Sequence, residues 1–158
     1  MTESGKAKLL RRTGRAAKAH YRAAVRYGFL DNIATAASLF GGVLVIVASL
    51  YAELLRNQIV ALGLAPLAVL TVAGFLIFVL TGAQAVWNWR AKSEQHRQVG
   101  ALYAKARRAV DAAGDNEAAL RKCRAQVDEI GEDSILVPPD IWKWAEREYA
   151  QKGPAGLK

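Results

Sequence analysis

Few residues of this chain have the types and spacing that chemistry requires. The two histidines, His20 and His96, lie far apart in the sequence, and neither has a cysteine or carboxylate pair nearby at metal-ligand spacing. Each is expected to be an ordinary surface or interfacial histidine. No glycine-rich phosphate loop and no acidic pair suited to general acid–base work occurs, so we predict a non-enzymatic protein without a metal or other cofactor.

The single cysteine, Cys123, cannot form an internal disulfide, which agrees with a reducing cytoplasm. It shares a helical face with apolar residues, so core packing is expected. The basic neighbours Arg121, Lys122 and Arg124 favour a thiolate, which leaves a redox role as the alternative.

The sequence is dominated by an uncharged middle, from Asn32 to Trp89, which only Glu53 and Arg56 interrupt. About 20 apolar helical residues cross a hydrocarbon core about 30 Å thick. Two stretches, about 33–54 and 63–87, reach this length without the charged face that a long helix needs in water. The sequence therefore predicts an all-α membrane protein with a transmembrane helical hairpin over 33–89.

Two alternatives bear on this hairpin. A cleaved signal peptide is disfavoured because the apolar run and the basic region before it are too long, and because a second span follows. The second span either starts near Gly63, with Pro66 in its first turn and 57–62 as an outer linker, or starts near Gln58 and kinks at Pro66.

Charge is distributed unevenly around the two spans. Of the net charge of +8, most lies in residues 1–32, and Arg90, Lys92 and Arg97 follow the second span. Because basic residues near span ends stay on the cytoplasmic side, we expect both termini in the cytoplasm and a multi-pass protein of the inner (plasma) membrane. Trp87 and Trp89 are placed to mark the inner interface.

Residues 1–32 are predicted to form a cytoplasmic basic amphipathic helix, most clearly over 4–28. Its stripe of basic residues comprises Arg11, Arg15, Lys18, Arg22 and Arg26. Such a stripe can lie on an anionic leaflet together with Arg90 and Lys92, or bind nucleic-acid phosphates, or stay solvated while the apolar side packs on other helices. The neighbouring membrane favours the first and third roles, which are compatible, and no nucleic-acid partner is expected.

Small and hydroxylated residues recur along both spans. In the first, Ala34, Ser38 and Gly42 are spaced four apart, and Ala37 with Gly41 forms a second small pair, which favours a close helix–helix contact in lipid. In the second, Thr71, Gly74, Phe78 and Thr81 form a stripe whose hydroxyls either bond to their own helix or line an oligomeric interface or pore.

Residues 90–152 are predicted to be a cytoplasmic helical bundle, and 153–158 a loose tail. The helix of the second span is expected to continue unbroken to Ala113, with Gly114 at its end and Asp115 as the next N-cap. A helix ending at Gly131 follows, with an apolar face of Leu120, Cys123, Val127 and Ile130. The last helix opens at Pro139 and buries Ile141, Trp142, Ala145 and Tyr149.

This order of parts resembles the SLATT family of two-transmembrane effectors of bacterial conflict and anti-phage systems. The resemblance rests on YRAAVRYGFLDNIATAASLFGGVLVIVA around the first span and ILVPPDIWKWAEREY near the end. It implies a homo-oligomeric effector that forms a pore or disrupts the inner membrane when triggered, in abortive-infection defence. It also implies partners encoded nearby, such as a nucleotide-second-messenger synthase, a nucleotide sensor or a reverse transcriptase. The alternative is a non-enzymatic membrane anchor or scaffold that docks a cytoplasmic partner.

Overall fold

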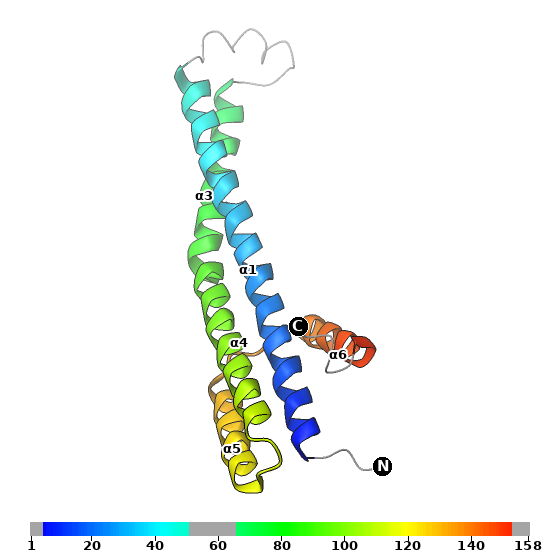
Figure 1. The fold of residues 1–158 in the computed structure, drawn as a ribbon. Coiled ribbons are helices and arrows are strands. Elements are labelled where there is room, and N and C mark those ends of the chain that lie inside the picture. The colour runs from blue at the N-terminus through cyan, green and yellow to red at the C-terminus, as the bar shows by residue number, and fades with distance from the viewer. Residues whose placement is uncertain (1–4, 51–65, 153–158) are drawn as a thin grey trace. The chain divides into compact units, whose positions relative to one another are not determined.

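The computed structural model describes residues 5–50 and 66–152 (Figure 1). In these two ranges the only regular elements are the helices α1 (Gly5–Leu50), α3 (Pro66–Trp87), α4 (Trp89–Ala112), α5 (Glu117–Asp133) and α6 (Pro139–Lys152). The all-α prediction is therefore confirmed for the described part of the chain. The start of the second span before Pro66 and the tail 153–158 lie outside the described residues.

The helices divide between two compact units. One, here called the apolar unit, comprises Gly28–Arg90, and the other, the polar unit, comprises Met1–Tyr27 with Ala91–Lys158. Each unit is described separately below.

Helix α1 contributes to both units without interruption. The sequence suggests a basic helix over 4–28 followed by a span from about 33, whereas the structure has one helix from Gly5 to Leu50. No proline lies within this range, and an isolated glycine such as Gly28 costs a helix only about 1 kcal/mol relative to alanine. Nothing local therefore forces a break.

Helices α3 and α4 are separated by one residue, so the prediction of an unbroken helix to Ala113 is wrong at Asn88. This residue has a φ of 44°, in the left-handed region, where asparagine is several times more common than most residues. Its N–H still donates to the Gln84 carbonyl at 2.9 Å, which keeps the interruption to a single residue. The aromatic rings of Trp87 and Trp89, on either side of it, stack at 5.6 Å.

Two further predictions, for the first and last residues of α5, are wrong. Gly114 ends α4 with a φ of 58°, as expected of a glycine at that position. The N-cap of α5 is Asn116 rather than Asp115, and its side-chain oxygen accepts from the N–H groups of Ala118 and Ala119 at 3.0 and 3.1 Å. Helix α5 also runs through Gly131 to Asp133.

The polar unit is built around the first part of α1. One buried cluster joins α1 to α4 and α5 and contains Leu9, Ala16, Ala17, Tyr103, Ala106, Val110, Cys123 and Val127. A second, smaller cluster joins α1 to α6 and contains Ala19, Ala23, Ile141 and Ala145. The expected apolar faces of α5 and α6 are confirmed, and the N-terminal helix is what covers them.

The Asn116 cap leads to a stability prediction. Replacing Asn116 by alanine should lower the free energy of unfolding by about 1 kcal/mol, because two N–H groups at the start of α5 lose their acceptor. Urea unfolding of the purified protein in detergent, followed by circular dichroism, measures this change. Asp115→Ala is the matched control and should have little effect; a larger loss in that variant would show that Asp115 is the cap.

Candidate functional site

The two helices of the apolar unit lie antiparallel and touch along one face of each. Gln84 of α3 donates to the Thr35 hydroxyl of α1 at 3.0 Å. Further along, a Cβ built on Gly41 would lie 3.0 Å from the Ile77 side chain. The contact of Gly41, later in α1 than Thr35, is with Ile77, which comes earlier in α3 than Gln84. The two helices therefore run in opposite directions. Ala34, only 3% exposed, lies on the same face of α1.

The small residues predicted for this contact divide between the two sides of α1. The hydroxyl oxygen of Ser38 is buried without a hydrogen-bond partner, as expected of a residue turned inward. Gly41 rather than Gly42 approaches α3, since a Cβ on Gly42 would meet nothing within 4 Å. Gly42 is therefore left open for a contact outside the chain.

The stripe predicted on α3 is largely uncovered within the chain, with only Gly74 half-buried. Phe78 is 74% exposed, Thr71 and Thr81 are exposed, and a Cβ on Gly74 would meet nothing within 4 Å. The Thr81 hydroxyl donates to the Ile77 carbonyl at 2.9 Å, so for this residue the bond to its own helix is confirmed. An aromatic ring and two hydroxylated side chains thus line one uncovered face of α3.

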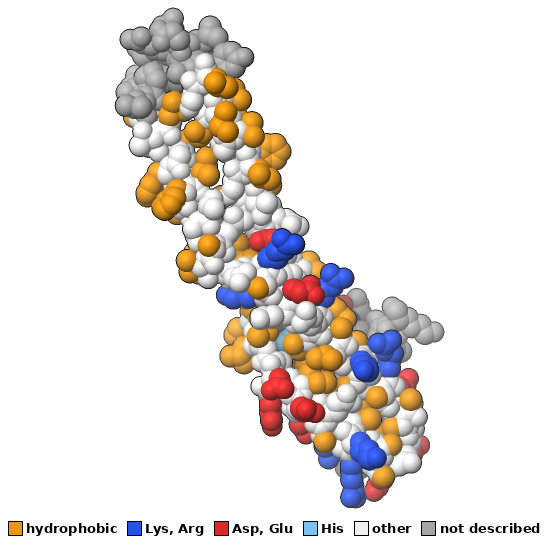
Figure 2. Space-filling model, turned by 90° about the vertical axis from the view of Figure 1, so that its left-hand side faces the viewer, with side chains coloured by type: hydrophobic (Ala, Val, Ile, Leu, Met, Phe, Trp, Pro, Cys, Tyr) orange, Lys and Arg blue, Asp and Glu red, His pale blue; other side chains and the backbone are white. Residues whose placement is uncertain are grey.

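Both apolar helices expose most of their hydrophobic surface, as Figure 2 shows for one face. Two helical stretches, Gly5–Leu50 and Leu70–Ala112 (most of α3 followed by α4), are long and apolar enough to cross a membrane, and their most apolar windows are only 6% and 0% buried within the chain. The core helix of a soluble protein would be mostly buried instead. Apolar surface of this extent marks a place where lipid or another protein binds.

In the polar unit, the predicted basic stripe of α1 lies against acidic and aromatic side chains of α6. Three ion pairs join the two helices: Arg15 to Glu146 at 2.9 Å, Lys18 to Glu148 at 3.4 Å, and Arg26 to Asp140 at 2.5 Å. The guanidinium carbon of Arg15 also lies 5.0 Å from the centre of the Trp142 ring, and that of Arg22 5.2 Å from the Trp144 ring. We call this set of contacts the α1–α6 ladder.

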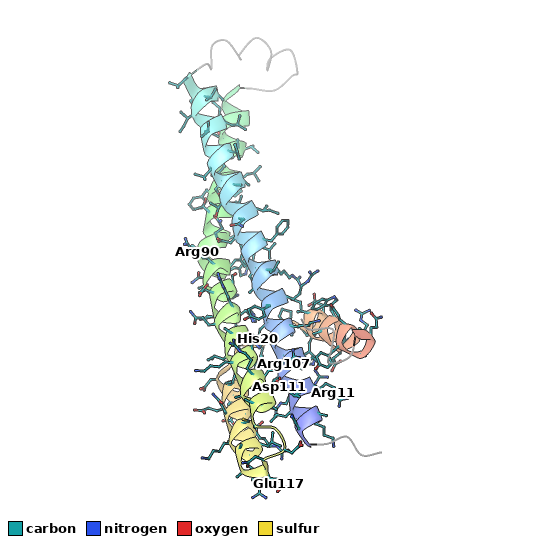
Figure 3. The ribbon with its side chains drawn as sticks, in the orientation of Figure 1. Arg11, His20, Arg90, Arg107, Asp111 and Glu117 are labelled. Carbon is teal, nitrogen blue, oxygen red and sulfur yellow. The ribbon has the colours of Figure 1, made fainter. Side chains whose placement is uncertain are left out.

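The other residues predicted to meet the membrane surface are more open. Arg11, Arg90 and Lys92 are all exposed, and Figure 3 labels the first two. Arg12, outside the predicted set, pairs with Asp128 of α5. Binding of the stripe to lipid stays a prediction.

The structure brings the two histidines together, which the sequence did not indicate. The Nδ1 atoms of His20 on α1 (labelled in Figure 3) and His96 on α4 lie 3.0 Å apart, and the residues are 3% and 2% exposed. Tyr103 stacks on His20 and Tyr27 on His96, with ring centres 5.7 and 5.5 Å apart. One imidazole must donate and the other accept, so a neutral pair satisfies the contact.

Burial disfavours the charged form of both histidines and so lowers their pKa values. Burial, and to a smaller extent the neighbouring His96, together lower the pKa of His20 from 6.5 to about 4. The pKa of His96 is lowered by burial as well. Neutral imidazoles can bind metals, but no group of three or more histidine, cysteine or acidic residues within 5–50 and 66–152 is placed to hold an ion. The pair forms a contact between α1 and α4.

No family model matches the sequence, and neither a curated protein nor a solved structure matches it.

The histidine pair predicts how stability depends on pH. Since His20 is neutral when folded but takes up a proton below about pH 6.5 when unfolded, its contribution is present above pH 6.5 and is lost as the pH falls toward 4. At pH 5 this loss amounts to about 2 kcal/mol. Urea unfolding at pH 7 and pH 5 measures it, and His20→Gln should reduce the difference between the two. An unchanged pH dependence in that variant would contradict the assignment.

The two neighbouring glycines of α1 give a matched pair of variants. Gly41→Leu should destabilise the apolar unit, because its side chain would overlap Ile77. Gly42→Leu should leave the fold intact but reduce the yield of crosslinked oligomer in detergent, if copies meet at the open side of α1. Thermal unfolding measures the first effect and chemical crosslinking the second. Full oligomer yield from Gly42→Leu would exclude this glycine from an interface between copies.

Proposed function

We propose that this chain is a membrane effector of a bacterial defence system of the abortive-infection type. In this proposal the two apolar helices form a transmembrane hairpin in the inner membrane, with both termini in the cytoplasm. Several copies assemble and open a pore or disrupt the bilayer when a partner or nucleotide signal acts on the polar unit. The chain carries out no enzymatic reaction of its own.

The observation that carries the proposal is the uncovered surface of the apolar unit. Its helices touch each other through Ala34, Ser38 and Gly41. This contact leaves Phe78 exposed and leaves free space beside Gly42 and Gly74. Two helices cannot enclose a path for water, so conduction would require several copies around an axis. The uncovered stripe of α3 offers hydroxyl groups and one bulky ring for the lining, and such uncharged pores gate by wetting and drying.

Membership of the SLATT family is part of this proposal. It accounts for the basic helix, the two apolar stretches and the ILVPPDIWKWAEREY segment, which corresponds here to residues 135–149 and includes most of α6. It also suggests the partners: a nucleotide-second-messenger synthase or sensor protein encoded nearby. A signal could act by repacking the polar unit, since a ligand shifts an equilibrium only through differential contacts.

The second candidate is a membrane anchor or scaffold that docks a cytoplasmic partner. It is favoured by the polar unit, where α1 contacts three other helices and exposes charged side chains on which a partner could dock. An anchor of this kind would insert and assemble without changing the permeability of the membrane.

Membrane potential separates the two candidates. Overexpression in bacteria should depolarise the inner membrane, and Phe78→Ser should make the protein leaky without a trigger, because a hydroxyl in place of the ring eases wetting. A potential-sensitive dye in growing cells reports both effects. Phe40→Ser is the matched control, since Phe40 is 73% exposed against 74% for Phe78 but lies on α1, away from the stripe.

Membrane fractionation and crosslinking must accompany the dye measurement. If wild type and Phe78→Ser both insert and oligomerise while the potential stays constant, the effector function is wrong and the scaffold takes its place. Equal leakiness of Phe40→Ser would instead show that the stripe of α3 does not line the path.

A further inference from the structure

The α1–α6 ladder places basic residues of α1 at successive helical turns against α6. Arg15, Lys18, Arg22 and Arg26 are spaced three or four residues apart, so they project from one side of α1. In the same order they contact Glu146, Glu148, Trp144 and Asp140. Helix α6 thus occupies the same stripe that the sequence suggests for an anionic membrane surface.

The ion pairs of the ladder are shielded from water to very different degrees. The side chains of Lys18 and Glu148 are 22% and 21% exposed, whereas those of Arg26 and Asp140 are 52% and 65% exposed. An ion pair this open to water is weak and is screened by salt. The Arg26–Asp140 contact is the shortest of the three at 2.5 Å, but its exposure makes it the one most open to screening and to competing anions.

This most exposed pair is also the nearest of the ladder to the apolar stretch in the sequence. Arg26 precedes Ile33 by seven positions in α1, which at 1.5 Å per residue is about 10 Å along the helix. A polar headgroup layer adds roughly 5–8 Å to each side of the hydrocarbon core, and a long arginine side chain can reach toward it. Headgroups would thus come within reach of Arg26 first and Arg22 next.

We propose that anionic phospholipid headgroups compete with Asp140 for Arg26 and with the Trp144 ring for Arg22, so that α6 loosens from its first turn in an anionic membrane. A headgroup phosphate accepts hydrogen bonds from a guanidinium as a carboxylate does, and an anionic leaflet attracts basic residues while repelling Asp140. The better-shielded pair between Lys18 and Glu148 and the buried Ala145 and Tyr149 would hold the rest of α6 longer. The inference rests on the proposed membrane crossing but not on pore formation.

Backbone hydrogen exchange of the full-length protein in lipid nanodiscs tests this competition. Amides in the first half of α6 should exchange about twofold to fivefold faster in discs of phosphatidylcholine with phosphatidylglycerol than in phosphatidylcholine alone, the range that one weak ion pair supplies. High salt should remove the difference, because exposed charges are screened. Amides of α5 provide an internal reference, since their exchange should not depend on the lipid.

Two variants show whether the named residues are responsible. The double variant Arg22→Gln with Arg26→Gln should abolish the lipid dependence, whereas Arg121→Gln should retain it, because Arg121 is exposed and lies outside the ladder. Equal exchange in both lipids, or a lipid dependence that survives in the double variant, would overturn the proposal. If wild type depolarises cells while its α6 exchanges independently of lipid, only this inference fails and the proposed function stands.

Discussion

The polar unit depends on the close approach that small side chains allow along the first part of α1. Ala16, Ala17, Ala19 and Ala23 are at most 8% exposed, and they lie on sides of α1 that face different neighbouring helices. Alanine has no side chain beyond Cβ, so helices can pack against it at short distance from several directions at once. One helix can therefore serve as the common partner of α4, α5 and α6.

Larger side chains then determine where along α1 each of these helices packs. The histidine pair joins α1 to α4, and the ladder joins α1 to α6. The two differ in physical character, because the imidazoles are buried and neutral while most of the ladder pairs are exposed and charged. The contact with α4 should therefore respond to acid, and the contact with α6 to salt and to competing anions.

The apolar unit follows a different principle, because its helices use little of their surface to hold each other. Contacts at Ala34, Gly41 and Gln84 are enough to pair α1 with α3, and large hydrophobic side chains point outward. In lipid such an arrangement costs nothing, since the surrounding chains are as apolar as the side chains. It also leaves open glycines and Phe78 available to neighbouring copies, and the proposed function relies on these residues.

The sequence alone determined the features that depend on local pattern. Apolar runs of membrane length, helical spacing on α5 and α6, and glycine at the end of α4 indicated the elements and their buried faces, because these signals act within a few turns of helix. Local choices between similar residues were less well determined. Asp115 and Asn116 are both good caps, and the chain geometry at Gly114 selected Asn116.

Only the tertiary structure decided which distant residues meet. His20 and His96 are 76 positions apart, and the ladder joins residues more than 110 positions apart, so no spacing in the sequence could signal either contact. The choice of Gly41 over Gly42 depended on the rotation of α1 against α3, which follows from packing and not from a four-residue repeat that both glycines satisfy. These contacts arise because helices far apart in the chain bury their faces together, and burial then determines which side chains pair.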